Sequence, residues 1–163
     1  CEKGIFAKAN TTPKYVIAEV KGDEIYGHNV GEAIDCSIFA AGDIVDVTGT
    51  SKGRGYSGVI KRYGKHIGPK GHGSGYHRQI GSLATNGRCN NRVHPGKKMS
   101  GHHGNTTATI LNLTVVSVDA SKNCILIKGA IPGPNKSTVK IRSAVKKSGK
   151  VDVKPLVNYA EAK

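Results

Sequence analysis

The stretch that decides the fold is ATILNLTVVSVDASKNCILIKGA, residues 108–130. Its two ends, residues 108–118 and 124–130, are rich in the β-branched residues that favour strands. The DASKN segment between them has the Asp, Ser and Asn that are typical of turns. The pattern therefore predicts two strands joined as an antiparallel hairpin.

A third strand is expected at residues 138–145, TVKIRSAV. In strict alternation, Val139, Ile141 and Val145 face one way, while the two cations between them face the other. This pattern predicts a half-buried strand whose wet face is cationic. The preceding IPGPNKS sequence, with two prolines and a glycine, is expected to force a bend.

Upstream, DIVDV at 43–47 and PKYVIAEV at 13–20 are further strand candidates, and SGVIKRY at 57–63 is the one short helix that the pattern supports. Cys36 and Cys124 stand in apolar strand patterns, which favours small buried hydrophobes. The four cysteines are too far apart for a disulfide scaffold, so reduced thiols are expected. The chain is interpreted as mainly β, a small β-barrel interrupted by a long irregular extension.

The charge of the chain is concentrated in that extension. The formal net charge is +14, from 25 Lys and Arg against 11 Asp and Glu. Residues 51–104 hold 11 of the cations and six His but no acid, whereas the remainder has 14 cations and 11 acids. So large an unbalanced charge repels itself, which favours a polyanionic partner.

The same segment contains 13 glycines in 54 positions. Glycine loses more backbone entropy on ordering than any other residue, and the segment has few apolar residues to offset that cost. We therefore expect it to be loose alone and to fold against RNA. Lys and Arg would neutralise phosphates, while Tyr, His and Arg would stack on bases. In this interpretation RNA takes the place of a hydrophobic core.

Motifs for other chemistry are weaker. GRGYSG at 53–58 matches the glycine pattern of a dinucleotide turn but lacks the acid about 20 residues later. In HPGKKMSG at 94–101, Lys98 occupies the place of the Ser or Thr of a phosphate loop. Cys89 and His94 are poorly spaced for zinc, and a nucleophile here would have no carboxylate to orient its base. The sequence therefore predicts no enzyme, no metal and no cofactor.

Four ordered stretches carry a resemblance to a known family, namely DVTGTSKGRGYSGVIKRY, GPKGHGSGYHRQIGS, RVHPGKKMSGHHGN and LTVVSVDASKNCILIKGAIPGPNKSTVKIRSAVK. Together they extend over roughly residues 42–146 and resemble the L-three family of large ribosomal subunit proteins. GIFAKANTTPKYVIAEV is similar to the family more weakly.

The resemblance implies a β-barrel of the translation-protein type, formed by residues 1–50 and 105–146, with its first strands before Cys1. Residues 51–104 correspond to an extension that penetrates rRNA, with its tip near 81–92, and residues 147–163 to a basic tail.

The resemblance also implies a structural role in the large subunit. Members bind rRNA near its 3′ end, join early in assembly and reach toward the peptidyl transferase centre without performing chemistry. The implied partners are large-subunit rRNA and neighbouring ribosomal proteins, with no membrane and no small-molecule substrate. The implied location is the cytoplasmic ribosome, or an organellar one. A DNA-compacting basic protein is the alternative from another class of binder.

The RNA-binding residues that we expect are the cations and most of the rings of the extension. The cations expected to contact phosphates are Lys52, Arg54, Lys61, Arg62, Lys65, Lys70, Arg78, Arg88, Arg92, Lys97 and Lys98. The rings expected to stack on RNA or donate to it are Tyr56, Tyr63, Tyr76, His72, His77, His94, His102 and His103.

Overall fold

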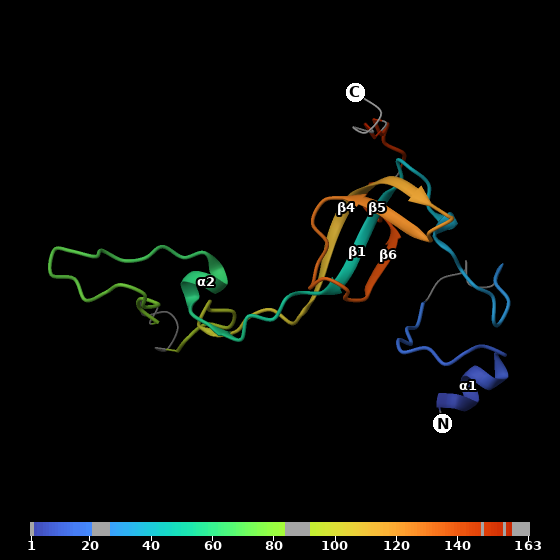
Figure 1. Ribbon diagram of the computed structural model, residues 1–163. Coiled ribbons are helices and arrows are strands. Elements are labelled where there is room, and N and C mark those ends of the chain that lie inside the picture. Colours follow the sequence, from blue (N-terminus) through green and yellow to red (C-terminus); the bar gives the residue numbers. More distant parts are fainter. Residues whose placement is uncertain (1, 21–26, 84–91, 148, 155, 158–163) are drawn as a thin grey trace.

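A computed structural model describes residues 2–20, 27–83, 92–147, 149–154 and 156–157. Its largest element is an antiparallel sheet of four strands in the order β5-β4-β1-β6. The strands are β1 (Ile44–Thr50), β4 (Thr107–Asp119), β5 (Cys124–Lys128) and β6 (Val139–Ser143). Residues 51–83 and 92–104 project from the end of the sheet where β1 stops and β4 begins (Figure 1). The expected mainly β class is confirmed.

The remaining elements are short. They are α1 (Glu2–Lys8), the 3-10 helix η2 (Cys36–Ile38), β2 (Tyr56–Ser57), α2 (Val59–Tyr63) and β3 (Gly101–His102). Strands β2 and β3 pair with each other as a separate antiparallel ribbon within the projection. No helix in the described part of the chain is long and apolar enough to cross a membrane.

The predicted hairpin is present as β4 and β5. Asp119 pairs with Cys124 at its closed end, so the turn lies in the DASKN segment as expected. There the carboxylate of Asp119 accepts hydrogen bonds from the Ser121 hydroxyl at 2.6 Å and from the Ser121 and Lys122 amides at 3.1 and 3.3 Å. The side chain of Asp119 therefore organises the turn that its sequence predicts.

The core is small and lies on one face of the sheet. Val45, Val47 and Val115 are fully buried at its centre. Half-buried apolar side chains surround them, namely Phe39, Leu113, Val118, Ile125, Ile127, Val139 and Ile141. Because all four strands and the segment before β1 contribute, the core stabilises the whole sheet and not a single hairpin.

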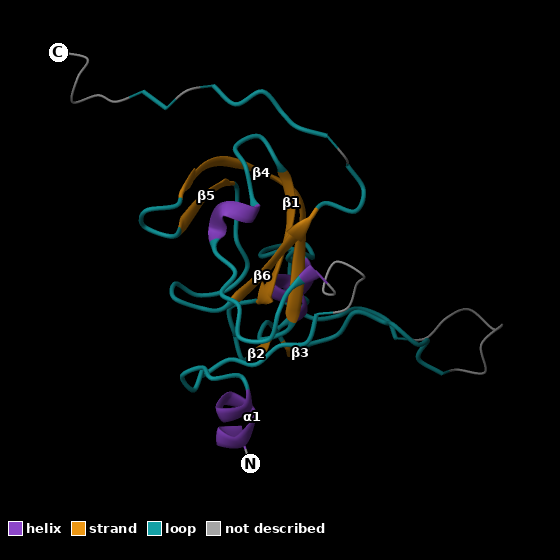
Figure 2. Cartoon of the chain, turned by 90° about the vertical axis from the view of Figure 1, so that its right-hand side faces the viewer, coloured by secondary structure: helices purple, strands orange, loops and turns teal. Residues whose placement is uncertain are grey.

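A buried carboxylate fixes an irregularity in the β1–β4 pairing. Val45 faces Leu113 but Val47 faces Ile110, so β4 carries an extra residue opposite Asp46. Asp46 is fully buried, and its Oδ1 accepts a hydrogen bond at 3.0 Å from the Asn112 amide in this bulge. A second bulge in β4, between Val115 and Ser117, shifts the pairing with β5. Bulges bend a strand, and β4 curves over the sheet in Figure 2.

The sheet is open in the described chain, with β5 and β6 at its edges. The strands predicted from 43–47, 108–130 and 138–145 and the helix predicted within 57–63 are confirmed. Closure into a barrel stays a prediction.

The strand expected at 13–20 is wrong. Residues 13–20 have no regular structure and are exposed along their whole length. A strand needs a neighbouring edge for its amides and carbonyls, and no described segment pairs with these residues. Their β-branched composition alone was an insufficient guide.

Three smaller expectations also need correction. Val145 is 73% exposed because β6 ends at Ser143, before the alternation reaches it. Cys124 is exposed at the start of β5, and Cys36 is buried in η2 rather than in a strand. Both of these thiols are free. Helix α1 was not predicted, because its short sequence carries no clear helical period.

We predict that Asp46→Ala lowers the free energy of unfolding by about 3 kcal/mol, because it removes a buried charged acceptor from the amides of Asn112 and Val145. It also leaves Arg142, whose Nη2 lies 3.7 Å from Asp46 Oδ2, without its carboxylate. Urea unfolding measures the loss. Asp152→Ala removes an exposed carboxylate and is the control, expected to change little. Equal effects of the two changes would contradict the role given to Asp46.

The turn predicts a pH dependence. The hydrogen bond from the Ser121 hydroxyl holds the pKa of Asp119 below its ordinary value. A pKa that is lower in the folded state adds stability above the unfolded pKa, and this stability is lost as pH falls through the folded pKa. We therefore expect Ser121→Ala to lower the melting temperature at pH 7, with the difference from wild type kept down to about pH 4 and lost only below it, as the pH falls through the lowered pKa of Asp119. The exposed Ser143→Ala variant should show no such pH-dependent difference.

Candidate nucleic-acid interface

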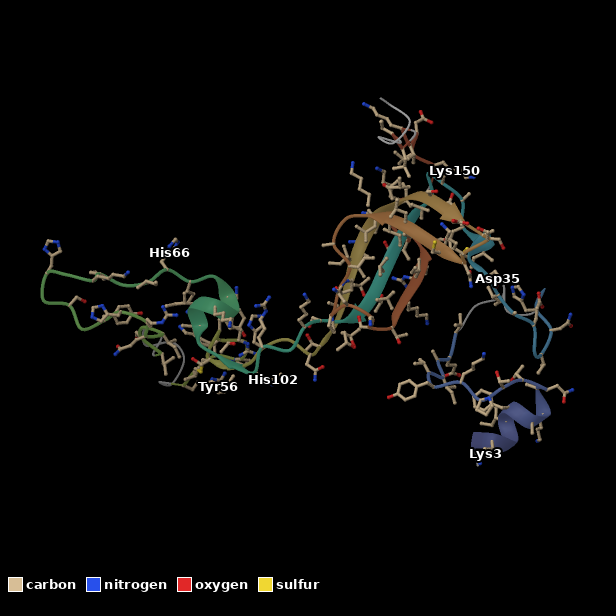
Figure 3. All side chains as sticks on the ribbon, in the orientation of Figure 1. Lys3, Asp35, Tyr56, His66, His102 and Lys150 are labelled. Carbon is tan, nitrogen blue, oxygen red and sulfur yellow. The ribbon has the colours of Figure 1, made fainter. Side chains whose placement is uncertain are left out.

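The extension begins as a paired ribbon. The Ser51 amide donates to the Thr106 carbonyl at 2.9 Å, and the Arg54 amide donates to the His103 carbonyl at 2.8 Å. Tyr56 then pairs with His102 where β2 meets β3, and Figure 3 shows these two residues side by side. The antiparallel pairing of β1 and β4 therefore continues outward into the extension, which makes its root an ordered structure.

Helix α2 closes this root. The predicted SGVIKRY helix forms at Val59–Tyr63, with Val59 only 1% exposed. It ends at Gly64, whose left-handed backbone (φ 65°) suits glycine and lets its amide bond the Ile60 carbonyl at 2.8 Å. The buried Val59 at the start of this short helix forms a small internal core, which the expectation of a wholly loose segment did not include.

A clamp of four residues, Arg62, Tyr63, Lys98 and Met99, joins α2 to the returning chain. Arg62 Nη1 donates to the Met99 carbonyl at 2.9 Å. The Arg62 guanidinium lies 5.0 Å from the centre of the Tyr63 ring, and Lys98 Nζ lies 5.6 Å from the same centre. Both distances suit cation–π contact, so Tyr63 receives two cations from within the chain.

Farther out, residues 65–80 form a loop stabilised by few contacts. The Gly68 amide donates to the His77 carbonyl at 2.8 Å, and the His77 Nδ1 lies 2.9 Å from the Pro69 carbonyl oxygen. An open cavity of about 380 Å³ is lined here by Ile67, Lys70, His77 and Arg78. No residue of this outer loop is buried, so its internal packing is slight.

Most of the expected RNA-binding residues lie exposed along this projection (Figure 3). Arg62, Lys65 and His103 are half-buried, and Arg88 lies outside the described residues, as does most of the expected tip at 81–92. Within the described chain, the ion pairs join His28 to Glu32, Lys122 to Asp119, Arg142 to Asp46 and Lys150 to Asp43. None of them involves residues 51–104, so the cations described there have no ion pair with a carboxylate of the described residues.

Three features of the site were not expected from sequence. Arg62 makes two contacts within the chain: one of its N–H groups donates to the Met99 carbonyl, and its guanidinium lies over the Tyr63 ring. The Nδ1 of His103 is buried and has no hydrogen-bond partner among the residues that the structure describes. His66, left out of the expected set, is exposed on the outer loop (Figure 3). Only His66 had a signal in the sequence, as a ring within the cationic run.

The described residues contain no cluster of three or more His, Cys, Asp or Glu that could hold a metal ion. Cys89, one of the zinc ligands considered above, lies outside the described residues. Acid-free, exposed cations interleaved with rings on an extended ribbon are typical of a basic nucleic-acid-binding protein.

Comparison with known proteins gives the family. The family model for ribosomal protein L3 matches residues 28–124. The large ribosomal subunit protein uL3 of Bacillus mycoides is 49% identical over 147 residues, covering 90% of this chain and 69% of the relative. The uL3 of Oceanobacillus iheyensis is 51% identical over 145 residues, with 89% and 68% covered. The chain belongs to the ribosomal protein L3 family.

A third relative, the uL3 of Spiroplasma kunkelii, is 49% identical over 145 residues. The chain spans about half of that relative, 55% of its length. The resemblance noted from the sequence motifs is confirmed.

We predict that Arg62→Gln loosens the return strand. Loss of a hydrogen bond from a charged donor and of the ring contact should raise amide exchange at residues 99–103 by at least about tenfold. Hydrogen–deuterium exchange of the full chain measures this. Lys61→Gln removes the same charge from an exposed neighbour on the same helix and should leave exchange unchanged. Matching exchange in the two variants would show that the clamp contributes nothing.

Proposed function

We propose that this chain is a structural constituent of the large ribosomal subunit that binds large-subunit rRNA through residues 51–104. The single observation that carries the proposal is the exposed, acid-free run of cations on the extension. Membership of the ribosomal protein L3 family indicates which RNA is bound, because the relatives are named large ribosomal subunit proteins. The role is structural, with no enzymatic activity and no cofactor.

Electrostatics supports the extension as the binding element. Its described cations form no ion pair with any carboxylate that the structure describes, so bringing them together costs free energy until counterions or phosphates neutralise them. Phosphates of rRNA would release the condensed counterions and make binding strongly salt-dependent. The exposed rings of Tyr56, Tyr76 and His72 stand among these cations, where unpaired bases can stack on them.

The two parts of the extension would bind differently. The root, with its ribbon pairing, α2 and the clamp, presents a preformed surface. The outer loop at 65–80 has few internal contacts and would take its final shape against RNA, so it pays the cost of ordering on binding.

The finer assignments follow from the family. In this proposal residues 1–50 and 105–146 form a barrel of the translation-protein type, and residues 51–104 run into rRNA near its 3′ end, toward the peptidyl transferase centre. Binding occurs early in subunit assembly, in a cytoplasmic or organellar ribosome, beside neighbouring ribosomal proteins. The two bulges that curve β4 support a barrel-like body, since bulges are common at the rims of barrels.

The salt response tests the proposal. If the extension contacts some six to ten phosphates, affinity for a 3′-domain fragment of large-subunit rRNA should fall by ~10³ to 10⁵ between 50 and 200 mM salt. The double variant Lys70→Gln/Arg78→Gln should reduce the slope of log affinity against log salt by about 2. Lys146→Gln/Lys147→Gln is the control, because it removes two charges outside the extension and should reduce the slope less. A nearly flat response of the unchanged chain would refute the assignment.

Competition with duplex DNA separates the proposal from a DNA-compacting protein. The long glycine-rich ribbon and its stacking rings suit folded, partly single-stranded RNA and have little use on a regular duplex. We expect the rRNA fragment to bind more tightly than a duplex with the same number of phosphates. Tighter binding of the duplex would favour the DNA-compacting alternative.

A further inference from the structure

We propose that a pocket at the base of the extension binds one phosphate group of the RNA backbone, an inference that rests on the proposed function. The neck pocket, as we call it, has a volume of about 380 Å³ and lies where the extension leaves the sheet. Its lining includes Ser51, Lys52, Arg54, His103, Gly104 and Gly133.

The pocket brings together three segments that are distant in the sequence. Lys52 and Arg54 come from the outgoing strand of the ribbon and His103 from the returning strand. Gly133 comes from the bend between β5 and β6, on the body. An anion held here would therefore contact both the extension and the body.

The charge of the lining suits an anion. Lys52 and Arg54 are exposed cations, and no acid lines the pocket. Neither side chain forms an ion pair with a described carboxylate. Two unneutralised cations beside one opening more than balance the single negative charge of one phosphodiester. The fork of the arginine can bind two of its oxygens.

The buried ring nitrogen of His103 points to a missing partner. Its Nδ1 is enclosed and makes no hydrogen bond with the described residues. A buried polar atom without a partner is costly, so it normally marks an absent water, ion or ligand. Because Nδ1 is enclosed, a phosphate oxygen in the pocket that His103 lines would accept a hydrogen bond from it after the ring turns, in the tautomer in which Nδ1 carries the hydrogen.

The backbone around the pocket is held in place. The Ser51 hydroxyl donates to the Thr106 carbonyl at 3.0 Å, and the His103 amide donates to the Gly55 carbonyl at 2.9 Å. Gly133 has a φ of 107°, and a Cβ there would lie 2.6 Å from the Thr50 carbonyl oxygen, so only glycine lets the bend approach β1. The pocket is thus built before any ligand arrives, which reduces the ordering cost of binding.

The test uses the full chain and the 3′-domain rRNA fragment. The double variant Lys52→Gln/Arg54→Gln should reduce the slope of log affinity against log salt by about 1, the value for one phosphate. His103→Phe keeps a ring without its nitrogens and should weaken binding by about tenfold with the slope little changed. Circular dichroism checks that both variants fold. Lys122→Gln is the control, because it removes a cation from the β4–β5 turn, which does not line the pocket.

If the double variant has the same slope as Lys122→Gln while the unchanged chain still binds RNA with a steep salt dependence, the pocket proposal is overturned and the proposed function stands. If the unchanged chain does not bind RNA, the proposed function itself fails. Titration with inorganic phosphate, followed by the NMR signals of the His103 ring, distinguishes a pocket for free phosphate from a pocket for a phosphate of the RNA backbone. Saturation by phosphate with no response to RNA would overturn the proposal, whereas a response to RNA that the double variant loses supports it.

Discussion

The antiparallel pairing of β1 with β4 is the contact on which the rest of the molecule depends. It places Thr50 opposite Thr107, so both ends of a segment of more than 50 residues are held together at one end of the two central strands. Closing so long a loop costs entropy, and the buried valines of β1 and β4 supply the contacts that offset it. The pairing then continues through Ser51 and Thr106 into the ribbon. A change that slipped this register would therefore displace the extension as a whole.

The extension is less uniform than its composition indicates. The lack of acids and the abundance of glycine predicted a segment with no interior of its own. In the structure, Val59 and Ser57 are buried at the root, and Arg62 binds the chain across from α2. That prediction therefore holds for the outer loop, where no residue is buried, and fails for the root. Arg62 is suited both to this internal contact and to the proposed RNA contact, since a guanidinium that donates to one carbonyl still has other donors for phosphate.

Local patterns predicted the elements that need only local information. The hairpin at 108–130, the strands near β1 and β6 and the helix within 57–63 are all marked by composition, alternation or turn residues. Residues 13–20 failed because a strand depends on a partner that its own sequence does not specify. Three features could not be predicted from local patterns. Asp46 and Arg62 bind residues 99 and 37 positions away, Val145 and Met99. The enclosed nitrogen of His103 depends on a pocket between distant segments.

The open edges of the sheet have a consequence for the behaviour of the purified chain. In the described part, β5 and β6 each leave one row of main-chain donors and acceptors unpaired, which can template edge-to-edge addition of another copy. Lysines on both strands and a net charge of +14 oppose this by mutual repulsion. Concentrated salt shortens the range of that repulsion. The ionic conditions that strip nucleic acid from the chain are thus the ones in which we expect its copies to self-associate and lose colloidal stability.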